Sequence, residues 1–321
     1  MRRRDPTIRR GTHLSLGTGA EFDAIRAMLH EWGARASGIG DDAAVLDVPP
    51  GTHLVASTDA TFEGVHFRRE WLSAEEIGAR AATAALSDLA AMAAEPLGLL
   101  LALGVPENWQ PELTELARGV GRVAEQGGCA IVGGNVTRAR ELSLTITVLG
   151  TAEHPLGRDG VSVGDVVFVT GRLGGPGAAL HALQSGRVPD AEHMMRFASP
   201  RARLAESRWL AAAGATAAID VSDGLVADLP HLARASEVSI ELDVGQVPRL
   251  DGVPPDEALA SGEEYELVVT FPSSAAPDVA AFERRFGIPL TRIGVAMAAS
   301  AEPVRSVGAR VDPARGHDHL S

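Results

Sequence analysis

The sequence predicts an α/β protein built from layers of helices and strands, because helical and strand-like patterns alternate along most of the chain. Apolar residues recur at helical spacing over 22–32 and 77–92, and short apolar runs typical of strands follow each of these segments. A stretch rich in turn-forming residues, 150–164, then interrupts the pattern before it begins again. That stretch predicts a boundary between two domains, 1–150 and 151–321.

The first domain is expected to begin with a helix, followed by a glycine-rich turn and a hairpin. Two strand-like runs flank Pro49-Pro50-Gly51, and a small-residue helix precedes a continuous apolar run typical of a buried strand. In chain order the expected elements are helix 22–32, strands 43–48 and 53–58, helix 77–92, strand 97–105, helix 112–125, and strands 129–132 and 142–149.

The second domain is expected to alternate strands and helices again. Its glycine-rich segment 171–177 lacks dinucleotide-binding spacing, which favours the start of a helix over a catalytic loop. The expected elements are strand 166–170, helices 178–183 and 203–213, strand 217–221, helix 225–235, and strands 239–242 and 266–271.

Composition excludes several classes of protein. The net charge of −13 disfavours partners such as nucleic acid or anionic lipid. All 29 basic residues are arginine, so a Walker-type phosphate loop, a catalytic lysine of the protein-kinase kind and a pyridoxal Schiff base are all excluded. If the protein handles a nucleotide, metal ions and arginine must neutralise its charge.

The sequence also indicates a reducing compartment. Cys129 is the single cysteine and cannot form an internal disulfide, and residues 1–10 contain no apolar run resembling a signal peptide. The longest apolar stretch, 90–105, is interrupted by Glu95 and Pro96, so no membrane role is expected. We therefore expect a cytoplasmic, globular protein.

Short acidic residues repeatedly stand where a strand or helix meets a turn. One such residue is ordinarily a cap or turn former, but several converging carboxylates form the oxygen-rich site that Mg²⁺ and a nucleotide require. A hydroxyl ligand is available at Ser57 or Thr58. The acidic candidates come from four segments: Asp41 and Asp42; Asp59; Asp88; and Asp220 with Asp223.

Other candidates are weaker. Gly133-Gly134-Asn135 follows an expected strand and would let a phosphate or adenine approach the backbone, while 220–224 ends a strand and begins a helix whose N–H groups suit a phosphate. Asp223 is equally interpretable as a helix cap. His66 and Glu263 suit a polar or cationic substrate, or an ordinary structural role.

These segments, taken in order, resemble thiamine-monophosphate kinase, a family within a superfamily shared with aminoimidazole ribonucleotide synthetase, selenophosphate synthetase and a hydrogenase-maturation protein. The resemblance runs from about Gly38 to the C-terminus. The matching segments are GIGDDAAVL (38–46), STDATFEGVHF (57–67), LSDLAAMAAEPLG (86–98), GGNVTR (133–138), DVSDGL (220–225), SGEEYEL (261–267) and GHDHL (316–320).

The resemblance implies two α/β domains with an aminoimidazole ribonucleotide synthetase-like fold, and a homodimer formed by N-terminal strands. It implies transfer of the ATP γ-phosphoryl group to thiamine monophosphate, giving thiamine diphosphate and ADP. Implied Mg²⁺ ligands are Asp42, Ser57, Thr58, Asp59, Asp88, Asn135, Asp220 and Asp223, with Asp88 and Asp223 catalytic. Gly134, Asn135, Arg158 and Ser222 would bind ATP, and His66 and Glu263 would bind the thiamine phosphate.

Three departures from the family pattern bear on affinity. Asn135 stands where the family commonly has aspartate, which predicts one weaker metal site. Glu264 replaces an aspartate in the SGEEYEL segment. In the tail, Ala314, His317 and Leu320 replace residues that include an aromatic ring expected to stack on thiamine.

Two alternatives remain open from the sequence. One keeps the fold and ATP but uses another phosphorylated acceptor, and the other is a nucleotide- or thiamine-phosphate-binding protein with impaired catalysis. Selenophosphate synthesis is disfavoured because Cys129 lies in an expected strand. The many mutually repelling aspartates favour an active enzyme over a pure binding protein.

Overall fold

The computed structural model describes residues 19–36, 39 and 43–308, and the chain divides into two compact units. The first unit comprises Met1–Leu86 and Pro96–Thr151, and the second comprises Ser87–Glu95 and Ala152–Ser321. Each unit is described by itself. Within the described ranges, no helix is sufficiently long and apolar to span a membrane.

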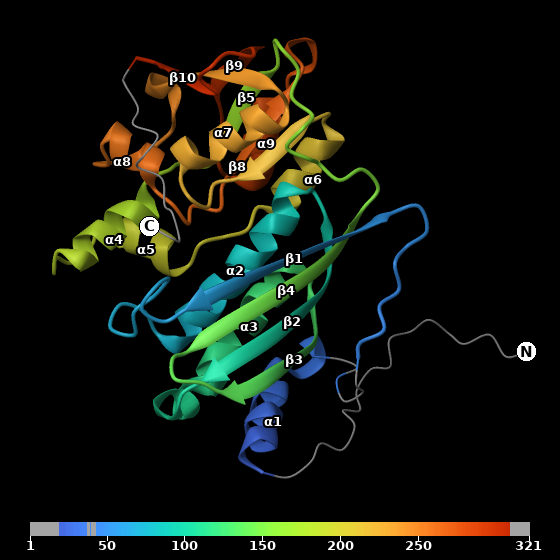
Figure 1. Cartoon of the computed structure of the whole chain (residues 1–321), viewed down its shortest axis with the longest axis vertical. Helices are drawn as coiled ribbons and strands as arrows, with labels where there is room; N and C mark the ends of the chain where they lie inside the picture. Colours follow the sequence, from blue (N-terminus) through green and yellow to red (C-terminus); the bar gives the residue numbers. More distant parts are fainter. Residues whose placement is uncertain (1–18, 37–38, 40–42, 309–321) are drawn as a thin grey trace, which may run out of the picture. The chain divides into compact units, whose positions relative to one another are not determined.

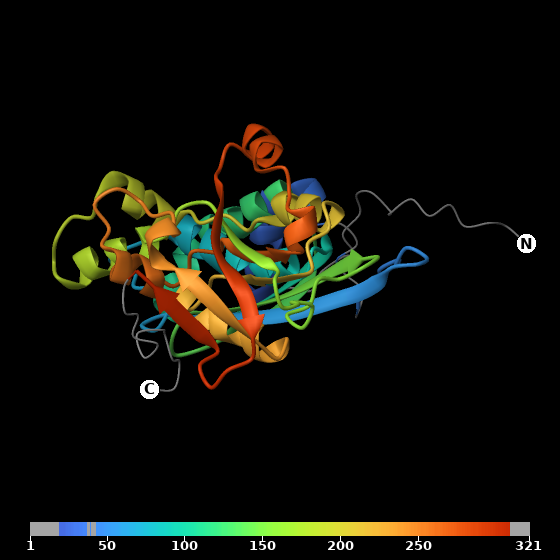
Figure 2. The same ribbon diagram turned by 90° about the horizontal axis from the view of Figure 1, so that it is seen from above.

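The first unit contains a four-stranded sheet in the order β1-β4-β2-β3, with its helices on one face (Figures 1 and 2). Strands β2 and β3 are parallel. Its elements are α1 (Ala20–Trp32), the 3₁₀ turn η1 (Gly33–Arg35), β1 (His53–Phe62), α2 (Ala74–Ala91, whose end lies in the second unit), β2 (Glu95–Val105), the 3₁₀ turn η2 (Glu107–Glu112), α3 (Leu113–Gly127), β3 (Ala130–Arg138) and β4 (Ser143–Ala152).

Helices α2 and α3 pack closely because glycines face backbone across their contact. A Cβ on Gly78 would lie 2.1 Å from the Leu116 carbonyl oxygen, and one on Gly119 would lie 1.9 Å from the Glu75 carbonyl oxygen. Any side chain at either position would therefore force the two helices apart.

Two sequence predictions about the first unit are wrong. Residues 43–48 form no strand, and β1 instead has β4 as its neighbour. Strand β3 does not end at Val132 but continues through Gly133 and Gly134, after a register shift opposite Leu99 and Leu100. Glycine is required inside this strand, since a Cβ on Gly134 would lie 1.9 Å from the Leu101 carbonyl oxygen.

The second unit contains a six-stranded mixed sheet in the order β10-β7-β9-β5-β8-β6, in which the β10–β7 pair is parallel and the other pairs are antiparallel. Its elements are β5 (Val166–Thr170), α4 (Gly175–Gln184), α5 (Ala191–Ala198), α6 (Leu204–Ala212), β6 (Ala217–Asp220), α7 (Leu225–Ala235), β7 (Val238–Asp243), η3 (Val244–Gln246), α8 (Pro255–Ala260), β8 (Leu267–Phe271), η4 (Ser273–Ala275), α9 (Val279–Phe286), β9 (Leu290–Ala298) and β10 (Val304–Val307).

Strands β5, β6 and β8 of this sheet are buried along their whole length, which explains their continuous apolar sequences. Val167 and Val169 of β5 belong to one core cluster together with Leu229 of α7. Phe168 lies between them in the sequence and meets Phe271 edge to face, with ring centroids 6.0 Å apart. Helix α7 contacts β6 and β7, while α9 contacts β9.

The sequence predicts β5 and α7 correctly, and 171–177 does lead into a helix, α4. The short elements are missed. Helices α5, α8 and α9 and strand β10 have at most eight residues each, too few to show a clear apolar period, and the longer strand β9 is missed as well.

Candidate active site

Asp220 is the last residue of β6 and begins the segment 220–224, here called the acidic loop. Its side chain is 5% exposed, and its Oδ2 accepts a hydrogen bond of 2.6 Å from the Ser87 hydroxyl. Burial raises the pKa of the Asp220 carboxyl to about 6, the Ser87 hydrogen bond opposes the rise, and the nearby charge of Asp88 adds to it. A bound cation would relieve this repulsion.

Asp88 lies near the C-terminal end of α2, in the part of the helix that belongs to the second unit. It is half-buried, whereas every other residue from Ile77 to Ala91 is buried. Asp88 therefore does not lie on a simple solvated helix face. The charge of Asp88 acts on Asp220 and raises the pKa of its carboxyl, so the two carboxylates interact.

Arg158 precedes β5 in the chain and supplies positive charge near this pair. Its guanidinium lowers the pKa of Asp220 by charge attraction, against the larger effect of burial. The Arg158 side chain is exposed, and its backbone oxygen accepts a 2.7 Å hydrogen bond from the Ser236 hydroxyl. An exposed arginine beside two carboxylates suits a phosphate that bridges the arginine and a carboxylate-bound cation.

Asp228, in the first turn of α7, holds the acidic loop and was missed by sequence reasoning. Its Oδ2 accepts hydrogen bonds from the backbone N–H groups of Ser222 and Asp223, at 3.0 and 3.1 Å. These two N–H groups are thus occupied by a carboxylate, and the expectation that the N–H groups of the following helix suit a phosphate stays a prediction. Its 3% exposure and its two backbone partners are features that only the fold reveals.

Asp223 is half-buried in the same loop and does not cap α7. The residue at the helix N-cap is Gly224, with φ of +104°, and no side chain caps the helix. The cap interpretation of Asp223 is therefore wrong. Ser222 and Asp223 are half-buried in a loop whose N–H groups are held by Asp228, and their role as ligands stays a prediction.

Ser57, Thr58 and Asp59 all lie on β1 of the first unit. Ser57 and Asp59 are half-buried and share a face, whereas Thr58 is exposed and its hydroxyl lies 3.0 Å from that of Thr147. Successive residues of β1 thus point to opposite faces of the sheet. The convergence of these residues with those of the second unit stays a prediction.

His66 lies in the turn after β1. Its Nδ1 accepts a 3.1 Å hydrogen bond from the Phe62 N–H, so in the neutral ring the proton is carried by Nε2. The same turn is held by Glu63, whose Oε2 accepts a 2.9 Å hydrogen bond from Trp109 Nε1. His66 is thereby oriented, and its Nε2 is the ring atom suited to donate to an anionic substrate.

The remaining candidates of the first unit lie along β3 or outside the described ranges. Gly134 and Asn135 are exposed residues of β3, and Asn135 is opposite Ala102 of β2. Asp42, together with Asp41 and the three tail residues Ala314, His317 and Leu320, lies outside the residues that the structure describes.

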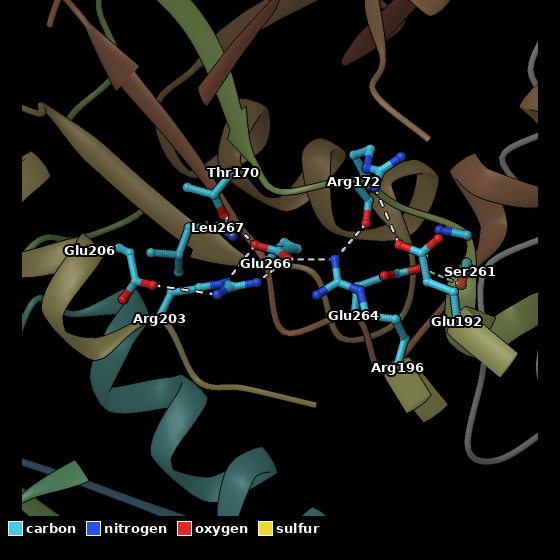
Figure 3. Close-up of polar contacts among 11 residues, drawn as sticks. Thr170, Arg172, Glu192, Arg196, Arg203, Glu206, Ser261, Glu264, Glu266 and Leu267 are labelled. Carbon is cyan, nitrogen blue, oxygen red and sulfur yellow. Dashed lines mark hydrogen bonds and ion pairs between the residues drawn. The ribbon is translucent and has the colours of Figure 1, made fainter. Parts of the chain in front are cut away.

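Residues 261–266, here called the glutamate turn, contain three glutamates in different settings, of which Figure 3 shows Glu264 and Glu266. Glu263 is half-buried, whereas Glu264 is 4% exposed and Glu266 is fully buried. The turn is hydrogen-bonded to the end of β6, with the Val221 N–H donating to the Glu266 carbonyl oxygen at 2.8 Å. This pairing brings the candidate substrate residue Glu263 to the same end of the sheet as the acidic loop.

Glu266 is the centre of a buried ion-pair network. Arg203 donates to both of its carboxylate oxygens at 2.7 and 2.5 Å, Arg196 donates at 3.0 Å, and the Thr170 hydroxyl donates at 2.7 Å (Figure 3). Burial raises the pKa of the Glu266 carboxyl, but the two guanidinium groups outweigh it and hold that pKa below its usual value. The network fixes the start of β8.

The donor set suits Mg²⁺, although no group of three or more histidine, cysteine, aspartate or glutamate residues in the described part of the chain is arranged to hold a metal ion by itself. Asp88 and Asp220 offer hard carboxylate oxygens beside an arginine. Mg²⁺ commonly takes one or two carboxylates and completes its shell with water and substrate phosphate. The pair therefore fits an ion delivered together with a nucleotide.

Comparison with known proteins covers nearly the whole chain. Residues 40–152 match the family described as AIR synthase related protein, N-terminal domain, and residues 162–305 match AIR synthase related protein, C-terminal domain. The chain is 36% identical over 280 residues to a thiamine-monophosphate kinase of Rhodopirellula baltica, covering 81% of this chain and 83% of that protein. A Salmonella typhimurium thiamine-monophosphate kinase is 34% identical, covering 89% of this chain and 92% of that protein.

Solved structures agree in fold. A thiamine-monophosphate kinase from Stenotrophomonas maltophilia K279a gives a TM-score of 0.80 at 34% identity, covering 92% of this chain and 98% of that chain. A structure described as AaThiL complexed with AMPPCP and TMP gives a TM-score of 0.75 at 30% identity, covering 95% and 99%. The predicted two-domain α/β fold is confirmed, and the chain belongs to the thiamine-monophosphate kinase family of the AIR synthase-related proteins.

Proposed function

We propose that this protein is a Mg²⁺-dependent kinase that transfers the ATP γ-phosphoryl group to thiamine monophosphate, giving thiamine diphosphate and ADP. The observation that carries the proposal is identity of 30–36% over most of the chain to thiamine-monophosphate kinases, one of them in a complex described with AMPPCP and TMP. The pairing of Asp88 with Asp220 beside Arg158 supplies the local chemistry.

The acceptor makes few demands on the protein. A phosphate monoester has a second pKa of about 6, so it is largely ionised at neutral pH and needs no strong general base. The difficulty is the approach of two anions. Alignment and charge neutralisation are therefore the whole task of the site, and arginine together with bound cations can perform it without lysine.

Bound Mg²⁺ would neutralise the phosphate oxygens and fix their geometry. Among its proposed protein ligands, Asp88 and Asp223 would be the catalytic residues. The ligands are Asp42, Ser57, Thr58, Asp59, Asp88, Asn135, Asp220 and Asp223.

Arg158 would bind ATP phosphate, as its exposed guanidinium beside Asp220 supports. Gly134, Asn135 and Ser222 are the further ATP contacts. His66 would donate from Nε2 to the phosphate of thiamine monophosphate, since Nδ1 is already an acceptor for Phe62. Glu263 would face the positively charged thiazolium ring.

The protein is further proposed to be a cytoplasmic homodimer. Strand β1 lies at the edge of its sheet, and Leu54 and Phe62 on it are 55% and 42% exposed. An edge strand with exposed apolar residues is suited to pairing with a second copy. The single, buried Cys129 is compatible with a reducing compartment.

The deciding experiment is an assay of the purified protein with Mg-ATP and thiamine monophosphate that follows thiamine diphosphate and ADP together. Equal formation of both is the expected result. ADP formation only with another phosphorylated acceptor would replace the substrate, and tight binding of thiamine monophosphate without turnover would indicate a binding protein. Light scattering of the same sample tests the dimer.

A further inference from the structure

The glutamate turn has an unusual backbone. Glu263 and Tyr265 both have left-handed φ angles, +57° and +51°, although neither is glycine. Residues with side chains rarely adopt this conformation, and it persists only where surrounding contacts hold it. Backbone hydrogen bonds to the end of β6 supply part of these contacts. The Glu263 N–H donates to the Ser222 carbonyl oxygen at 2.6 Å, and the Tyr265 N–H donates to the Val221 carbonyl oxygen at 2.9 Å.

This backbone conformation determines which side chains of the turn are buried. Glu264, Tyr265 and Glu266 are all buried, and Glu263 alone among the three glutamates is partly exposed. A turn with ordinary φ angles would rotate these side chains to other directions. The left-handed conformation is therefore what directs Glu263 away from the interior while its neighbours point inward.

Glu264 ties the turn to the first turn of α4 (Figure 3). Its Oε1 accepts hydrogen bonds from the Gly174 N–H at 2.5 Å and from the Ser261 hydroxyl at 2.6 Å, and the Ser261 Oγ in turn accepts one from the Gly177 N–H at 2.9 Å. The other oxygen, Oε2, has no hydrogen-bond partner among the described residues. Glu264 thus acts on the turn through one oxygen.

We propose that Glu264 is a positioning residue, whose hydrogen bonds to Gly174 and Ser261 hold the glutamate turn in the conformation that presents Glu263 to the thiazolium ring of the substrate. The inference rests on the proposed function, because the substrate is identified there. Glu264 itself does not touch substrate. Its longer side chain is what reaches the Gly174 N–H, a span that a shorter aspartate covers less well.

The charged groups around Glu264 agree with a neutral, hydrogen-bonding role. Arg196 of α5 lies near but donates to Glu266 and to the Arg172 carbonyl oxygen, while Glu266 at the start of β8 repels a charge on Glu264. Burial, as the largest effect, raises the pKa of the Glu264 carboxyl to about 8. At neutral pH glutamine is therefore a close mimic of the native side chain.

The kinetic test compares Glu264→Gln with Glu264→Ala at pH 7. Glutamine keeps the Oε1 acceptor, so the KM for thiamine monophosphate should stay within about threefold of wild type. Alanine should raise that KM about tenfold or more, with kcat and the KM for ATP changed much less, because the turn is released while the metal site remains. Ser261→Ala removes one of the two hydrogen bonds to Glu264 and should raise the KM for thiamine monophosphate to an intermediate value. It replaces Glu264→Ala in the test if Glu264→Ala does not fold.

Glu192→Gln is the matched control, because Glu192 pairs with Arg172 in the same region but is 43% exposed. It should leave all three constants unchanged. The proposal is overturned if Glu264→Gln raises the KM for thiamine monophosphate as much as Glu264→Ala does, which would mean direct contact through charge. It is equally overturned if neither Glu264→Ala nor Ser261→Ala raises that KM.

Amide hydrogen exchange separates this inference from the proposed function. The Tyr265 amide should be protected in wild type and Glu264→Gln, and should exchange at least about tenfold faster in Glu264→Ala, or in Ser261→Ala if the former does not fold. If wild type lacks turnover with thiamine monophosphate, the proposed function fails while this exchange result still decides the role of Glu264. Unchanged exchange in the variant would overturn that role whatever the substrate.

Discussion

The acidic loop and the glutamate turn lie at the same end of the second unit's sheet, yet they bury carboxylates in opposite ways. Glu266 of the turn has its charge matched by Arg203 and Arg196, each of which donates hydrogen bonds to it. Asp220 of the loop receives one from the neutral Ser87 hydroxyl and lies beside a second carboxylate, Asp88. Glu266 is hydrogen-bonded to two guanidinium groups, whereas Asp220 is hydrogen-bonded to a hydroxyl and feels Arg158 only through charge attraction.

The charge partners of these two carboxylates distinguish a structural acid from a candidate functional acid more clearly than their burial does. Both carboxyls are at most 5% exposed, and burial raises the pKa of each, but the arginines reverse that effect for Glu266 whereas the pKa of Asp220 stays raised at about 6. A buried acid without a matching base is costly to fold. Its presence beside Asp88 supports the proposed Mg²⁺ site.

The largest expected effect is on stability, at Glu266. Glu266→Gln would leave Arg203, itself 5% exposed, without its buried counter-charge, and should cost about 3–5 kcal/mol in free energy of unfolding. Urea unfolding followed by circular dichroism measures this cost. Glu192→Gln, at a 43% exposed ion pair, should cost less than about 1 kcal/mol. Equal small losses in both variants would mean that the buried ion pairs of Glu266 stabilise the fold no more than the exposed ion pair of Glu192 does.

The same acid-to-amide change at Asp88 should affect turnover and not folding. Asp88→Asn removes a charge that repels Asp220, so the midpoint of urea unfolding should be unchanged or higher. Turnover should fall by about 10²–10³-fold, since a group that neutralises charge in the transition state is lost. Asp251→Asn, at a fully exposed position, is the control. Wild-type turnover in Asp88→Asn would contradict a metal role for this residue.

Much of the contrast between the acidic loop and the glutamate turn could not be predicted from the sequence. Periodicity identifies the long elements, such as α2 and α7, and the position of Asp220 at a strand end follows from the apolar run before it. The pairing of Asp88 with Asp220 depends on residues 132 positions apart in the chain, and Ser87 completes it. No local pattern encodes that contact.

Asp228 and Glu264 show a second limit of sequence reasoning. Each has a carboxylate that accepts hydrogen bonds from backbone N–H groups, at Ser222 and Asp223 for the former and at Gly174 for the latter. Backbone donors carry no residue-type signal, so such partners cannot be inferred from composition or spacing. The glycine-rich and acidic loops both resemble phosphate cradles in sequence, yet several of their N–H groups are already occupied.

Glu264 offers a test of the comparison through pH. Because the pKa of its carboxyl is about 8 in the folded protein and near 4.5 when unfolded, the folded state binds the proton more tightly. Its contribution to stability is complete below about pH 4.5 and is lost as pH rises through 8. Glu264→Gln cannot lose a proton. The fall in thermal midpoint between pH 5 and pH 9 should therefore be several degrees smaller in this variant.

Arg196 and the first turn of α4 favour the charged form of Glu264, while Glu266 disfavours it. All of these groups are present in both proteins of this test. Differential scanning calorimetry of wild type and Glu264→Gln at matched pH values measures the difference. Parallel pH profiles would show that Glu264 is charged throughout, and would place it with Glu266 among the paired acids.

The smallest expected effect is at Asn135, an exposed amide on β3 that is one of the proposed Mg²⁺ ligands. Asn135→Asp adds a charged oxygen ligand, so the Mg²⁺ concentration for half-maximal activity should fall by a few fold while the maximal rate changes little. Asn108→Asp, at the chain's other asparagine, also exposed, makes the same change in net charge and should leave the Mg²⁺ titration unaltered. Equal shifts in both variants would mean that total charge, and not a ligand at position 135, sets the Mg²⁺ requirement.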